Sequence, residues 1–113
     1  MKAVLVVSAL SVGLFLVSCT RQQSVGAEAH QRMAAGAMLV DVRTPEEFAA
    51  GHLPGALNIP VDELPRRFSE LGSPDKPLIV YCRSGARSSR AERLLKERGF
   101  QDVFNLGPMS AWE

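Results

Sequence analysis

The stretch 78–99, LIVYCRSGARSSRAERLLKERG, decides the fold of this chain. An apolar β-type run is followed by a cysteine, a short polar loop and an amphipathic helical pattern that a glycine closes. This order predicts a buried strand with Cys82 at its C-terminal end. Because ligands of parallel sheets bind beyond the C-terminal ends of the strands, we expect the functional site at Cys82.

The six residues from Cys82 to Arg87, CRSGAR, form a candidate anion-binding loop. Backbone N–H groups of such a loop can point inward at the sulfur, and the start of the next helix adds the positive end of its dipole. Two flanking guanidiniums would lower the pKa of the thiol towards or below neutral pH and make Cys82 a nucleophile. The predicted anion-binding residues are Arg83, Ser84, Gly85, Ala86 and Arg87. The alternative is a buried structural cysteine, which would not need two arginines and a glycine behind it.

The spacing of cysteine and arginine indicates which anion the loop binds. Phosphatases of the cysteine class carry C-x5-R, a loop wide enough for a phosphate whose oxygens the arginine binds in a bidentate manner. Here that arginine position is Ser88, and Arg87 comes one residue earlier. The loop should therefore be tighter. It resembles the six-residue active-site loop of the rhodanese (thiosulfate sulfurtransferase) family, in which the cysteine carries a persulfide sulfur.

A second stretch, residues 39–60 (LVDVRTPEEFAAGHLPGALNIP), is similar to the upstream signature of the same family. In that signature an Asp-x-Arg ends a central strand, and an acidic residue and an aromatic lie on a short helix. The motif Gly-His-x-x-Gly-Ala-x-Asn-Ile-Pro then leads into the next strand. Asp41, Arg43 and His52 occupy their positions here. The resemblance covers nearly everything after about Ala27.

The resemblance implies a rhodanese-type transferase with a single α/β domain, in which a small parallel sheet is flanked by helices on both faces. It implies sulfur transfer through a persulfide on Cys82, from a small anionic donor such as thiosulfate to a thiophilic acceptor, without a metal or an organic cofactor. We expect Asp41 and Arg43 to brace the strand end as a charge-assisted pair and His52 to be a hydrogen-bonded packing residue. One departure is Pro108, where the family commonly has a second glycine.

Helical and strand-like patterns alternate along the rest of the chain. The predicted helices cover 27–35, 45–50 and, interrupted by Pro65, 61–71, and the predicted strands cover 38–42, 56–59, 78–81 and 102–105. Strands that alternate with helices indicate a parallel sheet with helices on both faces. Two capping boxes are predicted at helix starts, Thr44 with Glu47 and Ser89 with Glu92.

Composition and charge are typical of one ordinary globular domain. Hydrophobic residues make up 46% and charged residues 22% of the chain, and the formal net charge is +1, so neither a nucleic-acid surface nor a trap for acidic substrates is indicated. Positive charge is concentrated in and after the loop. We assign Arg90, Arg93 and Arg98 to a solvated helix face, because the same helix offers i,i+4 acid–base pairs.

Residues 1–19 resemble a bacterial lipoprotein signal peptide. A short positive start precedes an apolar run of roughly 15 residues, which is shorter than the ~20 residues that a membrane span needs. The run ends in Leu-Val-Ser-Cys, a lipobox-like sequence that implies cleavage before Cys19 and lipidation of Cys19. Residues 20–26 would then be a tether and 27–113 the rhodanese-like domain. We expect an exported, periplasmic, membrane-anchored lipoprotein; an ordinary cleaved signal peptide and an uncleaved anchor are the alternatives.

The two cysteines, Cys19 and Cys82, are not expected to pair, because a disulfide would consume the nucleophile. The sequence has no C-x-x-C and no Cys/His cluster at metal-ligand spacing, so no metal site is predicted. Two other functions stay open. One is a sulfur relay that serves a specific partner protein, and the other is a small-oxyanion reductase or phosphatase, against which the C-x4-R spacing argues.

Overall fold

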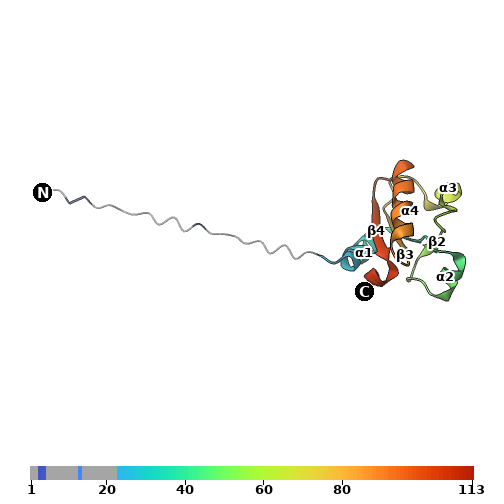
Figure 1. Ribbon diagram of the computed structural model, residues 1–113. Coiled ribbons are helices and arrows are strands. Elements are labelled where there is room, and N and C mark those ends of the chain that lie inside the picture. Colours follow the sequence, from blue (N-terminus) through green and yellow to red (C-terminus); the bar gives the residue numbers. More distant parts are fainter. Residues whose placement is uncertain (1–2, 5–12, 14–22) are drawn as a thin grey trace.

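The computed structural model describes residues 3–4, 13 and 23–113. Residues 23–113 contain a four-stranded parallel sheet in the order β2-β1-β3-β4 (Figure 1). The strands are β1 (Met38–Asp41), β2 (Leu57–Asn58), β3 (Leu78–Cys82) and β4 (Val103–Pro108). Cys19 and most of the predicted signal segment lie outside the described residues. In the part of the chain that is described, no helix has the length and apolar character needed to cross a membrane.

Helices cover both faces of the sheet, as predicted. The helical elements are α1 (Val25–Ala34), α2 (Pro45–Ala50), α3 (Leu64–Arg67) and α4 (Ala86–Glu97), with the 3-10 turns η1 (Phe68–Leu71) and η2 (Met109–Trp112). One buried cluster joins the sheet to α3, η1 and α4, and a second joins the other face to α1 and η2. Figure 1 shows α1 beside the C-terminus, where η2 lies. The architecture is therefore the expected single-domain α/β fold.

The central strand β3 places the cysteine. All five of its residues are buried. Val80 and Cys82 belong to the cluster under α4, whereas Ile79 and Tyr81 belong to the cluster under α1, because successive side chains of a strand alternate between faces. A strand that is covered on both faces requires an unbroken apolar run, which this sequence supplies. The thiol therefore lies on the face covered by the helix that follows the loop.

The helix α4 begins at Ala86, earlier than the capping box predicted at Ser89 implies. Gly85 has a left-handed backbone with φ +102°, which glycine adopts without a steric penalty, and the chain can therefore turn directly from the loop into the helix. The Ser89 hydroxyl lies in the first turn and donates a hydrogen bond to the Gly85 carbonyl oxygen at 2.9 Å. The capping box at Ser89 is therefore wrong, whereas that of Thr44 and Glu47 at the start of α2 is confirmed.

Other boundaries also differ from the prediction by a few residues, and three of the differences have a local cause. The helix α1 begins at Val25, because the Ser24 hydroxyl caps it by accepting a hydrogen bond from the Ala27 N–H at 3.1 Å. Pro65 lies in the first turn of α3 and interrupts no helix, since an N–H there has no helical partner. The strand β4 continues to Pro108 at the edge of the sheet, where a missing ladder hydrogen bond costs little.

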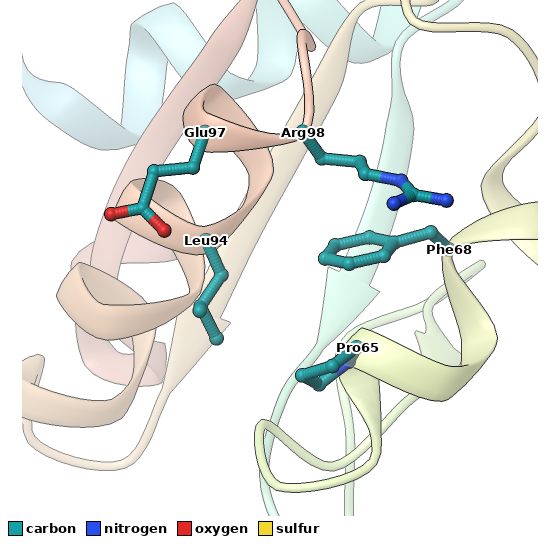
Figure 2. A pocket seen from close by; sticks show the side chains of 5 residues that line it. All are labelled: Pro65, Phe68, Leu94, Glu97 and Arg98. Atoms are coloured by element: carbon teal, nitrogen blue, oxygen red, sulfur yellow. The ribbon is translucent and has the colours of Figure 1, made fainter.

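A hollow of about 180 Å³ lies between α3 and the C-terminal half of α4 (Figure 2). Its lining residues are Pro65, Phe68, Leu94, Glu97 and Arg98. The Arg98 guanidinium lies over the Phe68 ring, 5.3 Å from its centroid, within the range of cation–π contacts. Because α4 begins beside the loop and this hollow lies near its other end, the hollow is separate from the cysteine.

Candidate active site

The side chain of Cys82 lies at the floor of the loop and has no exposed surface. The Gly85 N–H donates a hydrogen bond to its Sγ at 2.9 Å. The Ser88 hydroxyl lies 3.4 Å from the same sulfur and 3.0 Å from the Gly85 carbonyl oxygen. Arg83 and Ser84 are exposed. The loop thus places N–H and O–H groups around the sulfur. Its first charged side chain, that of Arg83, is exposed to solvent.

Hydrogen bonding lowers the pKa of the Cys82 thiol below its ordinary value. Burial alone raises that pKa, but the Ser88 side chain and the N–H groups of Ser88, Gly85 and Ser84 together outweigh the effect of burial. The direction of this shift agrees with the expectation from the sequence. Its expected cause, the two loop arginines, is not the leading one. The donors that surround the sulfur make the larger contribution.

Ser88 is a member of this site that the sequence reasoning missed. A helix that started after Ser89 would have given Ser88 no role, whereas the observed start at Ala86 brings its buried hydroxyl next to the sulfur. A hydroxyl can both donate and accept. When the thiol is protonated, it donates to Ser88, which donates to the Gly85 carbonyl oxygen. When the thiol is ionised, the Ser88 hydroxyl can rotate and donate to the sulfur, which favours the thiolate.

We expect Ser88→Ala to raise the pKa of the Cys82 thiol, because the thiolate loses a donor. Thiolate absorbance in the ultraviolet, followed against pH, measures the shift. Since the protonated thiol is a poor nucleophile, alkylation of the variant should be slower at neutral pH and should recover as the pH rises. Ser89→Ala is the matched control, because Ser89 bonds the same Gly85 carbonyl oxygen. Superimposable titration curves for Ser88→Ala and the wild type would contradict this role of Ser88.

The two loop arginines have different environments. Arg87, in the first turn of α4, forms a bidentate ion pair with Glu47 of α2, with Nη1–Oε1 at 2.6 Å and Nη2–Oε2 at 2.9 Å. The hydrogen bond from Arg87 is the main reason that the pKa of Glu47 falls to about 2, and bonds from Thr44 lower it further. Arg83 is exposed and forms no ion pair with any residue of 23–113. Arg83 is therefore the loop arginine whose charge is available to an anion.

Asp41 and Arg43 form an ion pair at the end of β1. Asp41 is fully buried, and its carboxylate accepts hydrogen bonds from Arg43 Nη2 at 2.6 Å and Nε at 3.0 Å. The Tyr81 hydroxyl donates to the same carboxylate at 2.7 Å, a contact that the sequence did not indicate. Burial, and then this bond, raise the pKa of Tyr81 to about 12. Because Arg43 also donates to the Gly51 carbonyl oxygen at 2.7 Å, the pair connects β1, β3 and the end of α2.

His52 is hydrogen bonded, as the sequence led us to expect, but it is exposed. Its Nδ1 lies 3.0 Å from the Phe48 carbonyl oxygen, and its ring stacks on the Phe48 ring with centroids 3.7 Å apart. Both contacts are made with Phe48 of α2. The structure therefore places His52 in the turn after that helix and not in the loop of Cys82.

A hollow of about 280 Å³ lies beside the loop. Its lining residues are Arg43, Glu47, Ala50, Gly51, Arg83 and Met109. Arg83 follows Cys82 directly and Met109 follows β4, so the hollow lies at the C-terminal edge of the sheet, where ligands of parallel sheets bind. Arg83 lines the hollow, whereas the buried Cys82 that precedes it is not one of the lining residues.

A parallel α/β sheet with a cysteine of lowered pKa in a donor-lined loop is an arrangement that can hold an anionic group at the sulfur. The model of the rhodanese-like domain matches residues 26–113. The chain therefore belongs to the rhodanese-like family, and its enzyme class is the rhodanese-type transferase.

Similar proteins include two that are named sulfurtransferases. The chain is 43% identical over 77 residues to the uncharacterized protein YqhL of Bacillus subtilis, a match that covers 67% of this chain and 60% of YqhL. It is 38% identical over 86 residues to thiosulfate sulfurtransferase GlpE of Stutzerimonas stutzeri, covering 75% of this chain and 78% of GlpE. The structure of the human single-domain sulfurtransferase TSTD1 is similar with a TM-score of 0.66 and 35% identity, covering 75% of this chain and 88% of that one.

Proposed function

We propose that the protein moves a sulfane sulfur from thiosulfate or a persulfide donor to a thiophilic acceptor through a persulfide on Cys82. The observation that carries this proposal is the environment of the thiol, whose Sγ accepts the Gly85 N–H at 2.9 Å and whose pKa is lowered by surrounding donors. A relative named thiosulfate sulfurtransferase supports thiosulfate as a donor.

The transfer takes two displacement steps. In the first, the Cys82 thiolate attacks the outer sulfur of thiosulfate; the S–S bond of the donor breaks, and sulfite leaves with the bonding electron pair. The terminal sulfur of the new persulfide keeps the negative charge, which the N–H groups of the loop stabilise. In the second, the acceptor attacks that terminal sulfur and the Cys82 thiolate leaves. With cyanide as acceptor the product is thiocyanate, and no metal or organic cofactor takes part.

Mass spectrometry of the protein after incubation with thiosulfate tests the proposal. We expect the tryptic peptide that contains Cys82 to gain one sulfur atom, and cyanide to remove it with release of an equal amount of thiocyanate. A thiosulfate-treated protein that gains no sulfur on Cys82 and forms no thiocyanate would refute the proposal.

Arg83→Ala should lower kcat/KM for thiosulfate by about 10- to 100-fold, because the donor and the departing sulfite lose a cationic contact. Steady-state thiocyanate formation measures the loss. Arg93→Ala is the control, since Arg93 is exposed on α4 beyond the loop and its removal should change kcat/KM by no more than about twofold. Equal losses of kcat/KM in the two variants would mean that the arginines act through the overall positive potential of the protein and not through a direct contact of Arg83 with the donor.

We further propose that the protein is exported and held at a membrane by lipid on Cys19. The lipobox-like end of residues 1–19 and the polar stretch after it support this proposal. Mass spectrometry of the mature N-terminal peptide should find an acylated Cys19, and Cys19→Ser should leave an unprocessed precursor while Cys82→Ser is processed normally. A soluble wild-type protein with an unmodified N-terminus would refute the lipoprotein assignment.

A further inference from the structure

Glu47 borders the hollow beside the loop and is held from two sides. Its carboxylate accepts hydrogen bonds from both Nη atoms of Arg87, and Oε1 also accepts one from the Thr44 N–H at 3.2 Å. The side chains of Glu47 and Arg87 are only 26% and 34% exposed, so the pair is partly withdrawn from solvent. With the pKa of Glu47 at about 2, the carboxylate is charged at every pH of a normal assay.

The ion pairs around the hollow leave it with a single uncompensated positive charge. Arg43 is neutralised by Asp41 at 2.6 Å, and Arg87 is neutralised by Glu47 at 2.6 Å. Within residues 23–113, Arg83 is the cation of the hollow that has no ion-pair partner. Ala50 and Met109 contribute apolar wall. Arg43 and Arg83 line the hollow, and Arg87 is connected to it through its ion pair with the lining residue Glu47, so only one of these three arginines keeps an uncompensated charge.

We propose that Glu47 is a specificity-determining residue, which neutralises Arg87 and so favours sulfur donors with one negative charge over the dianion thiosulfate. The proposal rests on the proposed sulfur transfer. A dianion gains from each further uncompensated guanidinium, whereas a monoanion with an organic arm needs one cation and an apolar wall. Glu47 places a negative charge at the hollow, and its ion pair with Arg87 makes the positive charge of Arg87 unavailable to a donor bound there.

Two sulfur donors that react by the same chemistry but differ in charge can test this role of Glu47. Thiosulfate and benzenethiosulfonate both present an outer sulfur to the Cys82 thiolate. In each case the same kind of S–S bond breaks, and the leaving group, sulfite or benzenesulfinate, departs with the electron pair. The donors differ by one unit of charge and by the aromatic arm. The ratio of their kcat/KM values therefore reports how the site ranks a dianion against a monoanion.

Glu47→Gln removes the charge and keeps an acceptor oxygen for Arg87 and for the capping interaction with Thr44. We expect the kcat/KM ratio of thiosulfate to benzenethiosulfonate to rise about three- to tenfold, mainly through a lower KM for thiosulfate. Asp62→Asn is the matched control, because it makes the same change in net charge. Asp62 pairs with Arg90 of α4, with Oδ1 and Nη1 2.8 Å apart, but this pair is exposed and lies outside the hollow. The kcat/KM ratio of Asp62→Asn should stay at the wild-type value.

A binding measurement keeps this inference distinct from the proposed function. Calorimetry with the two leaving groups, sulfite and benzenesulfinate, requires no turnover, and Glu47→Gln should bind sulfite about three- to tenfold more tightly with little change for benzenesulfinate. If the wild type transfers no sulfur, the proposed function fails while these affinities still decide the role of Glu47. An unchanged or weaker affinity for sulfite in Glu47→Gln, or an equal gain in Asp62→Asn, would overturn the inference.

Discussion

Cys82→Ser is expected to abolish sulfur transfer from thiosulfate to cyanide, a loss of at least about 1000-fold or ~4 kcal/mol of transition-state stabilisation. A serine hydroxyl stays protonated at neutral pH and cannot carry a persulfide sulfur, so neither displacement step can take place. The change removes little volume, and the Gly85 N–H and the Ser88 hydroxyl can bond an oxygen as they bond Sγ. Thiocyanate formation measures the activity, and mass spectrometry measures the sulfur bound per chain.

The control for this variant is its stability. Because Cys82 is buried among apolar side chains, a loss of activity has meaning only if the variant unfolds at nearly the same urea concentration as the wild type. A folded Cys82→Ser protein that retained a tenth of the activity would show that another group accepts the sulfur. A folded, inactive variant that still bound sulfite would locate the defect in the chemical step.

Local sequence patterns were sufficient to predict the sheet and the position of the loop. The unbroken apolar run before Cys82 required burial on both faces, and the capping box of Thr44 and Glu47 required only a spacing of three residues. The capping box predicted at Ser89 is wrong, because Gly85 and not Ser89 precedes the first residue of α4. Gly85 is also an acceptable residue at a helix start, and giving it that position would have placed Ser88 in the first turn.

Contacts between distant segments could not be predicted from spacing. Arg87 and Glu47 are 40 residues apart, as are Tyr81 and Asp41, and no local pattern specifies either pair. The loop sequence indicated that two guanidiniums would be near the sulfur. It could not indicate that one of them would be neutralised, because that depends on where α2 packs against the start of α4.

Asp41→Ala should lower the free energy of unfolding by about 3–5 kcal/mol, because it removes one partner of a buried ion pair. The Arg43 guanidinium, in a residue only 5% exposed, would keep its charge without a counter-ion, and the Tyr81 hydroxyl would lose its acceptor. Urea denaturation followed by circular dichroism measures the loss. Because Arg43 also lines the hollow beside the loop, Asp41→Ala frees a positive charge there as well, so the bracing role is tested by the free energy of unfolding and not by activity.

Asp62→Ala is the control for that variant, since Asp62 pairs with Arg90 at 2.8 Å but its side chain is 82% exposed. Water compensates an exposed charge that loses its partner, so the cost should be at most about 1 kcal/mol. The double variant Asp41→Ala/Arg43→Met should be more stable than Asp41→Ala alone, because the uncompensated charge is then removed as well. If Asp41→Ala and Asp62→Ala cost the same, the ion pair of Asp41 and Arg43 does not brace the end of β1.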